Sequence, residues 1–304
     1  MSPEPTTPGL VVRQQSGFHS VQTGQGVVVC RLRGRLKKGP QEGDIVAVGD
    51  RVHISVLPDG SGAIERVEPR QKALVRLAPT ARGAYQQVLL SNPDQIVLVF
   101  ACSQPAPSLR MLDRFLVICE KQNIPPVIVA NKVDLIGQER AMEIFSIYSP
   151  LGYPVLYTSA REGLGAEALR QCLVGKISGL AGPSGVGKSS LLNAIRPQLG
   201  LEVREVSQST LKGRHTTQVR ELFSLEEGGY VADLPGLRTL SLWDTEPEEL
   251  DAYFVEIRPF VEHCQFNDCT HTNEPGCAVR AAVDQGRIHA RRYESYLRLR
   301  GGDE

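Results

Sequence analysis

Residues 182–189, with the sequence Gly-Pro-Ser-Gly-Val-Gly-Lys-Ser, have the composition and spacing of a phosphate-binding loop. Glycines in such a turn permit positive φ angles and let backbone N–H groups surround the phosphates of a nucleotide. Lys188 is predicted to reach the β- and γ-phosphates, and the Ser189 hydroxyl is predicted to bind Mg²⁺. An apolar run before the loop and a helical pattern after it favour this interpretation over a flexible turn, because a helix N-terminus attracts phosphate. The predicted nucleotide-binding residues here are Gly182, Pro183, Ser184, Gly185, Val186, Gly187, Lys188, Ser189 and Ser190.

The tetrapeptide Asn131-Lys132-Val133-Asp134 follows an apolar run and carries side chains suited to guanine. The Asp134 carboxylate would accept hydrogen bonds from guanine N1–H and the 2-amino group, and adenine has neither donor there. Hydrogen bonds to a charged group contribute about 1.5–3 kcal/mol each, so such a site rejects analogues that lack the donors. The Asn131 side chain would brace neighbouring loops, and the aliphatic part of Lys132 would cover the base. An ordinary polar turn is the alternative.

Three shorter segments fit the same chemistry. Ser159 and Ala160 end a further apolar run and are similar to the Ser-Ala segment whose backbone N–H contacts guanine O6. Asp233 and Gly236 end the run 230–232, where Asp233 would bind Mg²⁺ through water and the Gly236 N–H would contact the γ-phosphate. A threonine of the polar stretch 202–217 could ligate Mg²⁺ as well. A mobile loop and a simple Pro-Gly turn remain alternative interpretations of the last two segments.

Cys264, Cys269, His271 and Cys277 place three thiols and an imidazole within fourteen residues. Four such ligands suit a closed, tetrahedral, structural Zn²⁺ site with no position left for catalysis. His263 is a rival ligand by sequence alone. The other four cysteines stand singly in apolar surroundings, so buried thiols and a reducing cytoplasm are expected.

The whole chain has 304 residues and 34 basic against 34 acidic side chains, so bulk charge indicates no nucleic-acid partner. Its first nine residues lack the apolar core of a signal peptide, and no apolar run is long enough to span a membrane.

The hydrophobic pattern predicts three domains. Short Val/Ile-rich segments separated by turns predict an all-β OB-fold barrel in an RNA-binding domain, 1–82. Alternating strands and helices predict a central α/β P-loop domain, 83–242, with a mostly parallel sheet. A mainly helical zinc-binding domain, 243–304, follows. Cations of the barrel would face either a phosphate backbone or solvent; they are Arg31, Arg33, Arg35, Lys37 and Lys38.

The order of the motifs is unusual, because the guanine-recognition tetrapeptide and the Ser-Ala segment precede the phosphate loop. A circularly permuted GTPase domain has this order. In the barrel, the permuted motifs and the Cys/His tail, the chain resembles the small-ribosomal-subunit-dependent GTPases of the RsgA/YjeQ family. The resemblance implies hydrolysis of GTP to GDP and phosphate, stimulated by the small (30S) ribosomal subunit, in late maturation of that subunit. Leu234 and Gln218 depart from the residues usual in that family.

The resemblance also implies roles for single residues. It selects His271 over His263 as the fourth zinc ligand and assigns catalysis to His215, with Lys188 and Thr217. We prefer Thr217 to Thr216 as the Mg²⁺ ligand. Leu237 stands where many GTPases have a water-orienting glutamine, so slow intrinsic turnover is expected.

The expected partners are GTP and GDP, the small ribosomal subunit and its 16S rRNA, with no membrane and a monomeric chain. The arginines of the tail would contact rRNA or lie on a solvated helix; they are Arg287, Arg291, Arg292, Arg298 and Arg300. The alternative function is a GTP-gated RNA-binding assembly factor whose hydrolysis is incidental.

Overall fold

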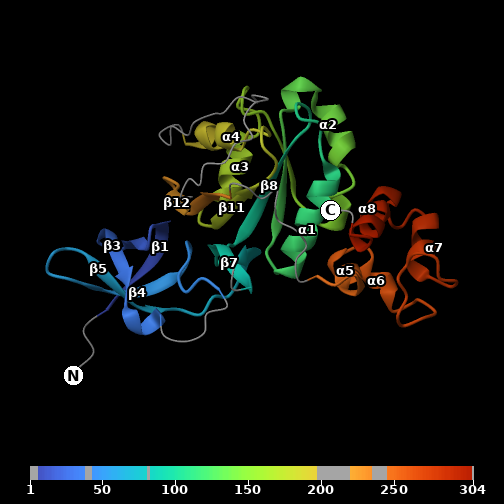
Figure 1. Cartoon of the computed structure of the whole chain (residues 1–304). Coiled ribbons are helices and arrows are strands. Elements are labelled where there is room, and N and C mark those ends of the chain that lie inside the picture. Colours follow the sequence, from blue (N-terminus) through green and yellow to red (C-terminus); the bar gives the residue numbers. More distant parts are fainter. Residues whose placement is uncertain (1–5, 38–42, 81–82, 197–219, 235–244, 303–304) are drawn as a thin grey trace. The chain divides into compact units, whose positions relative to one another are not determined.

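The computed structural model describes residues 6–37, 43–80, 83–196, 220–234 and 245–302 (Figure 1). These residues divide into two compact units. The first unit takes its residues from Met1–Ile96, Glu167–Ala181 and Lys188–Gly236, and the second from Val97–Ala166, Gly182–Gly187 and Leu237–Glu304.

The first unit begins with a closed five-stranded barrel, as the sequence predicts. Its strands are β1 (Thr7–Gln15), β2 (Phe18–Thr23), β3 (Gly26–Leu32), β4 (Arg51–Val56) and β5 (Gly62–Val67), and a 3-10 turn, Gly34–Lys37, follows β3. The strand order is β1-β2-β3-β5-β4, and pairing of β1 with β4 closes the barrel. Only β3 and β5 pair in parallel among these neighbours. Alternate residues point inward, so that Val11, Val21 and Ile54 form part of its buried core.

A long hairpin follows the barrel and consists of β6 (Ala73–Thr80) and β7 (Gly83–Ser91). The sequence pattern did not indicate β7, because its polar and apolar residues alternate only weakly. The predicted domain boundary at 82/83 lies between these two paired strands, and the domain limits stay predictions.

The remaining strands of the first unit continue the sheet of the barrel. β11 (Ile177–Ala181) pairs in parallel with β13 (Tyr230–Asp233), which pairs antiparallel with β12 (Arg220–Ser224). β12 in turn pairs antiparallel with β1, with Arg13 opposite Glu221. The helices α3 (Ala166–Leu173) and α4 (Lys188–Ile195) flank β11 in the chain. The strand that leads into the phosphate loop and the barrel therefore share one hydrogen-bonded ladder.

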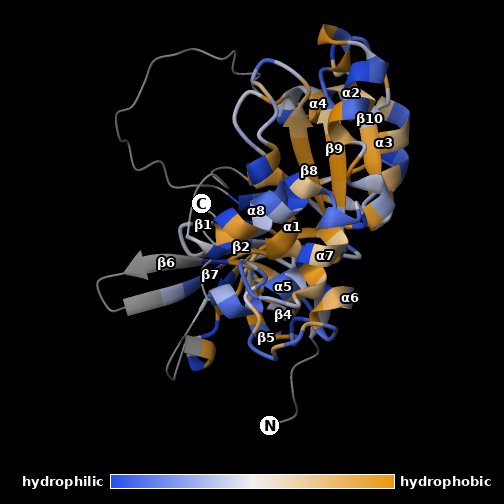
Figure 2. Ribbon diagram, turned by 90° about the vertical axis from the view of Figure 1, so that its right-hand side faces the viewer, coloured by the Kyte–Doolittle hydropathy of each residue, from blue (hydrophilic) through white to orange (hydrophobic). Residues whose placement is uncertain are grey.

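The second unit is built on the strands β8 (Gln95–Ala101), β9 (Pro126–Asn131) and β10 (Val155–Thr158), in the order β10-β9-β8. β9 and β10 are parallel, with Thr158 opposite Asn131, so their carboxyl ends lie at the same edge. All of β8 is buried, and Figure 2 shows these strands as continuous hydrophobic ribbons. This is the pattern of a parallel sheet covered on both faces. The connecting helices are α1 (Leu109–Lys121) and α2 (Gln138–Phe145), with 3-10 turns at Val133–Leu135 and Ser149–Leu151.

The C-terminal part of this unit is mainly helical, as predicted. Its elements are a 3-10 turn (Pro247–Glu249), α5 (Leu250–Tyr253), α6 (Arg258–Val261), α7 (Ala278–Asp284) and α8 (Ala290–Arg300), coloured orange to red in Figure 1. Phe254, Ile257 and Tyr296 form its core together with Val117 of α1. No helix in the described ranges is long and apolar enough to cross a membrane.

Candidate nucleotide and metal sites

Asn131, at the carboxyl end of β9, connects three segments of the predicted nucleotide site. Its Nδ2 donates a hydrogen bond to the carbonyl oxygen of Val186 at 2.8 Å. Its Oδ1 accepts from the Thr158 hydroxyl at 3.0 Å and from the backbone N–H of Ala160 at 3.3 Å. Because all of these groups are buried or half-buried, the amide holds the Ser-Ala segment and the phosphate loop in fixed positions. Thr158 was not predicted as a site residue, and its only signal was its place directly before Ser159.

Asp134 and Lys132 lie beside this amide on the same turn. The Ser159 hydroxyl donates to Oδ1 of Asp134 at 2.7 Å and so fixes the carboxylate. Lys132 adopts a left-handed backbone conformation, with φ 64°, and its ammonium group donates to the carbonyl oxygen of Gln104. Burial lowers the pKa of Lys132, and the charge of Asp134 opposes that shift. The residues predicted to recognise guanine therefore lie together at one edge of the sheet.

The glycines of the phosphate loop adopt the positive φ angles that the sequence predicts. Gly182, Gly185 and Gly187 have φ angles of 146°, 79° and 95°. A Cβ at Gly182 would meet the carbonyl oxygen of Val99, and one at Gly187 would meet Nδ2 of Asn131. A side chain at Gly187 would therefore displace the amide that connects the two halves of the site. Pro183 and Ser184 complete this turn.

The predicted Mg²⁺-binding groups that the structure describes belong to the first unit. Lys188, Ser189 and Ser190 form the first turn of α4, directly after the loop in the chain. Asp233 ends β13, and its Oδ1 is buried with no hydrogen-bond partner in the described part of the chain. Burial raises the pKa of Asp233, and the nearby charge of Lys188 partly offsets the rise. A buried carboxylate oxygen without a hydrogen-bond partner is suited to accept a hydrogen bond from a water molecule bound to Mg²⁺.

Leu234, which departs from the family pattern, is a core residue. Its N–H donates to the carbonyl oxygen of Leu180 at 2.8 Å, and a Cβ at Gly179 would meet its side chain. The Leu234 side chain therefore contributes to core packing next to β11 rather than to nucleotide binding. His215, Thr216, Thr217, Gly236 and Leu237 lie outside the described residues.

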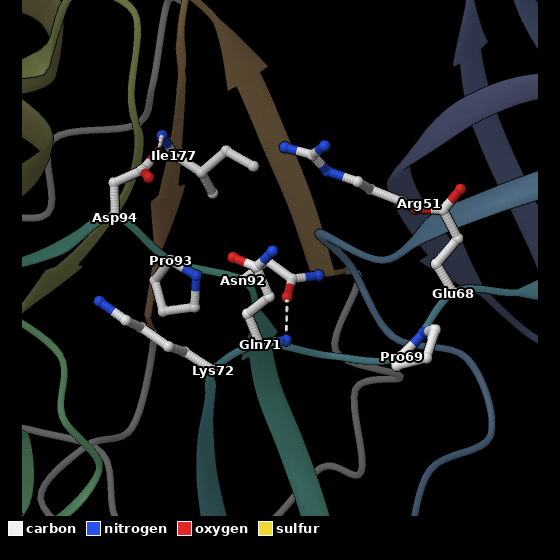
Figure 3. A pocket seen from close by; sticks show the side chains of 9 residues that line it. All are labelled: Arg51, Glu68, Pro69, Gln71, Lys72, Asn92, Pro93, Asp94 and Ile177. Atoms are coloured by element: carbon white, nitrogen blue, oxygen red, sulfur yellow. Dashed lines mark hydrogen bonds between the residues drawn. The ribbon is translucent and has the colours of Figure 1, made fainter.

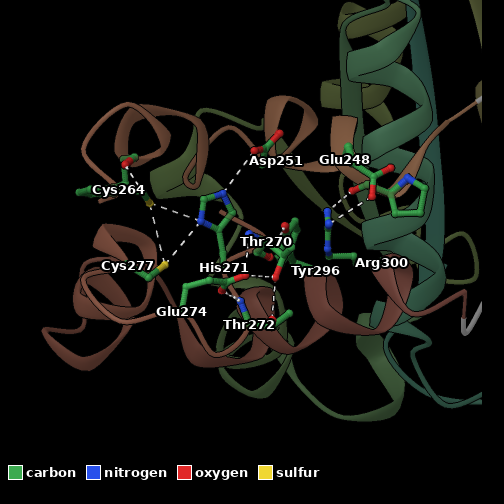
Figure 4. Close-up of polar contacts among 12 residues, drawn as sticks. Glu248, Asp251, Cys264, Thr270, His271, Thr272, Glu274, Cys277, Tyr296 and Arg300 are labelled. Atoms are coloured by element: carbon green, nitrogen blue, oxygen red, sulfur yellow. Dashed lines mark hydrogen bonds and ion pairs between the residues drawn. The ribbon is translucent and has the colours of Figure 1, made fainter. Parts of the chain in front are cut away.

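The four predicted zinc ligands converge in one cluster. Figure 4 shows three of them, Cys264, His271 and Cys277. Nδ1 of His271 lies 3.5 Å from Sγ of both Cys264 and Cys277, and these two sulfur atoms are 4.0 Å apart. The donor atoms of all four residues lie within 4.8 Å of one another. Zn–S bonds of ~2.3 Å and Zn–N bonds of ~2.0 Å in a tetrahedron require separations of roughly 3.5–3.8 Å, so the cluster fits zinc. His263 is exposed and does not join it.

Neighbouring residues orient the ligands of this cluster. Nε2 of His271 lies 3.3 Å from Oδ2 of Asp251, which places a carboxylate behind the imidazole. The Tyr293 hydroxyl donates to the carbonyl oxygen of His271 at 2.6 Å, and the Tyr296 hydroxyl donates to that of Thr270 at 3.0 Å. Sequence analysis did not identify Asp251, because nothing in the pattern connects a carboxylate of α5 with a histidine twenty residues later.

The Glu274 carboxylate fixes the turn between the ligands. It accepts hydrogen bonds from the backbone N–H groups of Thr270 and Thr272 at 2.9 Å each. These bonds, with that of the Thr270 hydroxyl as the largest cause, lower the pKa of Glu274 to about 2. Hydrogen bonds to the ionised Glu274 carboxylate therefore fix residues 270–274, which we call the metal turn.

The prediction that Arg292 contacts RNA or lies on a solvated helix face is wrong in both alternatives. This side chain is fully buried and forms ion pairs with Asp113 of α1 and Glu256, each at 2.5 Å. Arg298 pairs with Glu294 on the same helix, and the Arg287 guanidinium lies 4.6 Å from the centre of the Phe260 ring. Among these five arginines, Arg287 and Arg291 are exposed, and Arg300 pairs with Glu248. The burial of an arginine cannot be predicted from local sequence when its ion-pair partners lie far away in the chain.

A separate cavity of about 160 Å³ lies in the first unit (Figure 3). Arg51, Glu68 and Lys72 contribute charged groups, and Asn92 accepts from the N–H of Gln71 at 2.9 Å. It contains none of the predicted nucleotide-binding residues.

Comparisons with known proteins cover nearly the whole chain. A family model described as RsgA GTPase matches residues 67–243, and one described as RsgA N-terminal domain matches residues 8–64. A protein of Gemmatimonas aurantiaca named small ribosomal subunit biogenesis GTPase RsgA is 44% identical over 298 residues, 97% of each chain. A protein of Moorella thermoacetica with the same name is 44% identical over 95% of this chain and 94% of its own.

Solved structures agree with this result. The crystal structure of YjeQ from Thermotoga maritima superposes with a TM-score of 0.79 at 39% identity, and covers 98% of this chain and 99% of that one. YloQ, described as a circularly permuted GTPase, gives a TM-score of 0.74 at 32% identity, with 99% and 96% coverage. The permuted fold is therefore shared over the full length.

Proposed function

Because this chain belongs to the RsgA GTPase family and is a GTP-hydrolysing enzyme, we propose that it acts in the late biogenesis of the small ribosomal subunit, which stimulates its hydrolysis. One observation carries the proposal: relatives with that name match the chain from end to end, barrel and Cys/His cluster included. The proposal further includes that the protein is a cytoplasmic monomer and that it contacts 16S rRNA.

The nucleotide contacts follow from the arrangement at the carboxyl end of β9. Asp134, held by Ser159, accepts from the guanine base. The backbone N–H of Ala160 donates to Oδ1 of Asn131 at 3.3 Å and would contact guanine O6 by sharing or exchanging that bond. Asn131 supports this pocket and the phosphate loop together, as its bond to Val186 indicates. The loop and Lys188 bind the phosphates, so binding of the base and of the phosphates depends on one buried amide.

Hydrolysis requires a water molecule held in line with the γ-phosphate. We assign its positioning to His215, because Leu237 can neither donate nor accept a hydrogen bond. Mg²⁺, bound with Ser189, Thr217 and the water-mediated Asp233, would neutralise phosphate charge. Lys188 stabilises the same charge from the protein side. Slow turnover of the isolated enzyme follows from this weak positioning of water.

The metal cluster has a structural role in this proposal. Three thiolates and one imidazole fill the tetrahedral positions of Zn²⁺ and leave none for a substrate. The helices around it form a core with α1, so zinc supports the fold of the second unit.

The test compares GTP turnover of the purified chain alone, with small subunits and with large subunits. We expect stimulation by small subunits only. Lys188→Ala should lose nucleotide binding, whereas His215→Ala should bind GTP normally and turn it over slowly. Equal rates with and without small subunits would contradict the proposal and favour a GTP-gated RNA-binding factor.

A further inference from the structure

The strand β12 lies between the barrel and the strand that carries Asp233. It pairs antiparallel with β1 on one side and with β13 on the other, and β13 ends at Asp233. Arg220 is the first residue of β12 and lies opposite Gln14 of β1. Thr217, the preferred Mg²⁺ ligand, stands three residues before Arg220, so their Cα atoms can be at most about 11 Å apart. A contact that fixes Arg220 therefore limits the positions that Thr217 can reach.

The Arg220 side chain is held by the hairpin and by a loop of the barrel. Its guanidinium group donates a hydrogen bond to the carbonyl oxygen of Val88 in β7 at 2.7 Å. The same nitrogen atom lies 3.5 Å from a carboxylate oxygen of Asp44, with which it forms an ion pair. Only 20% and 18% of the two side-chain surfaces are exposed, so solvent screens this pair less than an ion pair on the surface. Arg220 is thus fixed against two elements other than its own strand.

The Asp44 carboxylate is itself fixed in place. Its Oδ1 accepts a hydrogen bond from the Tyr85 hydroxyl and its Oδ2 accepts one from the N–H of Val88, each at 3.0 Å. Burial, followed by the hydrogen bond to Asp44, raises the pKa of Tyr85 to about 12, so this hydroxyl remains a donor at neutral pH. The loop that carries Asp44 also contributes Val46 to the barrel core. The carboxylate therefore gives Arg220 a fixed contact with the barrel.

A second arginine lies near this pair. Burial and the positive charge of Arg220 both lower the pKa of Arg76 on β6, because the two cations are close enough to repel each other. Arg76 donates to Oε1 of Gln87 at 2.7 Å. The negative charge of Asp44 offsets this repulsion and keeps Arg220 at its place on the hairpin.

We propose that Arg220 and Asp44 are positioning residues for Thr217, and that by fixing the start of β12 to the barrel they favour binding of GTP over GDP. In GTPases the switch threonine contacts Mg²⁺ and the γ-phosphate, and GDP has no γ-phosphate. A fixed attachment three residues away leaves a chain segment fewer conformations to lose when it binds. The barrel would thereby contribute to nucleotide discrimination without touching the nucleotide. The inference rests on the proposed assignment of Thr217 to Mg²⁺.

The experiment measures the affinity of the full chain for a fluorescent, non-hydrolysable GTP analogue and for fluorescent GDP, each with Mg²⁺. Arg220→Met keeps the aliphatic part of the side chain and removes its donors. It should weaken binding of the analogue about 2- to 30-fold, the range for residues that act through others, and leave GDP affinity unchanged. Asp44→Asn should give a similar loss, and the double variant should lose no more than either single variant. Arg220→Lys should restore most of the affinity.

The matched control is Arg13→Met. Arg13 pairs with Glu221 of the same strand β12, but at 3.9 Å and with 43% and 36% of the side-chain surfaces exposed. Exposed ion pairs contribute little, so loss of this pair should change neither affinity.

Two results would overturn the inference. Equal losses of analogue and GDP affinity in Arg220→Met, with a lower melting temperature, would assign the contact to stability alone. Unchanged analogue affinity, or additive effects in the double variant, would show that the pair does not act on the nucleotide. Thr217→Ala separates this inference from the proposed function. If Thr217→Ala leaves analogue affinity unchanged, the Mg²⁺ assignment fails; if it weakens binding and Arg220→Met does not, only the role of Arg220 fails.

Discussion

At the scale of single residues, Asp134 and Ser159 are the two side chains that we propose determine which base is bound. The Ser159 hydroxyl holds Oδ1 of this carboxylate at 2.7 Å, which leaves the second oxygen for the base. In the proposed site, base specificity would depend on the charge of that second oxygen and on its fixed orientation.

We therefore expect Asp134→Asn to exchange the preferred base. Ser159 would still donate to the amide oxygen, so the amide N–H would face the base and repel the guanine 2-amino group. Loss of two hydrogen bonds to a charged acceptor predicts roughly a 100-fold or greater loss of GTP affinity, whereas xanthosine triphosphate, with a carbonyl at that place, should bind. Calorimetric titration of both nucleotides checks this, with Glu139→Gln on the exposed side of α2 as the control. Unchanged GTP affinity would contradict the assignment of Asp134.

Asp233 illustrates a conflict between stability and function. Burial raises its folded pKa above the unfolded value, so the group stabilises the fold at low pH and that contribution is lost as the pH rises through the folded pKa. The raised pKa means that ionisation of this carboxyl group costs stability in the nucleotide-free protein, where its buried Oδ1 has no hydrogen-bond partner in the described residues.

Asp233→Asn should therefore raise the melting temperature of the nucleotide-free protein at pH 7, and the difference should shrink towards pH 4. GTP turnover at saturating Mg²⁺ should fall by orders of magnitude, since the metal loses its carboxylate. Thermal scans at several pH values, with parallel turnover assays, measure both effects. If Asp233→Asn were less stable at pH 7 than the unmodified protein, another group would have to stabilise the Asp233 carboxylate in the nucleotide-free state, which would contradict this prediction.

At the scale of elements, α8 binds the metal turn and α1 at the same time. Its tyrosines hold the backbone of Thr270 and His271, and Arg292 on the same helix pairs with Asp113 of α1. The Tyr148 hydroxyl also donates to Asp113, at 2.8 Å. The helix thus connects the Cys/His cluster with α1, which covers the sheet that carries the residues predicted to recognise guanine.

Removing this connection should be costly. Arg292→Ala would leave Asp113 and Glu256 buried without a cation, and loss of one partner of a buried pair costs about 3–5 kcal/mol in the free energy of unfolding. Arg291→Ala on the exposed side of the same helix is the control and should change it by less than about 0.5 kcal/mol. Urea unfolding monitored by circular dichroism measures both. Similar values for the two variants would mean that water replaces the ion pairs.

Patterns of elements were predictable where local chemistry determines them, and failed where distant contacts do. Short Val/Ile-rich segments between turns predicted the barrel, and apolar runs ending before Asn131 and at Thr158 predicted two of the parallel strands. Weak alternation concealed β7, which is stabilised by its pairing with β6. The burial of Arg292 depends on Asp113, 179 residues away, and no periodicity encodes such a contact.

At the scale of the whole molecule, the metal turn supports more than its own loop. Cys277 belongs to the same core as Val117 of α1 and Phe254. Structural zinc sites contribute apparent free energies of about 10–16 kcal/mol, so a zinc ion bound by these four residues would make the fold of this region dependent on the metal.

Cys277→Ser should release the zinc, reduce the helical signal of the C-terminal region and lower the melting temperature of the chain. Metal content by plasma emission and circular dichroism check these outcomes. Cys172→Ser provides the control, because its thiol belongs to the first unit, donates to Gln95 and is not a member of the cluster. Full zinc content in the Cys277 variant would show that the remaining residues suffice.

The long separation between Asp113 and Arg292 has a consequence for biosynthesis. When the chain is synthesised from its N-terminus, α1 and the strands before the phosphate loop are made early. Val186, the partner of Asn131, is synthesised 55 residues later. Arg292, the cation that pairs with Asp113, is synthesised 179 residues after Asp113. Until α8 has been made, the Asp113 carboxylate has no arginine to neutralise it, so α1 cannot bury that surface. Completion of the nucleotide-binding unit is thereby postponed until almost all of the sequence has been translated.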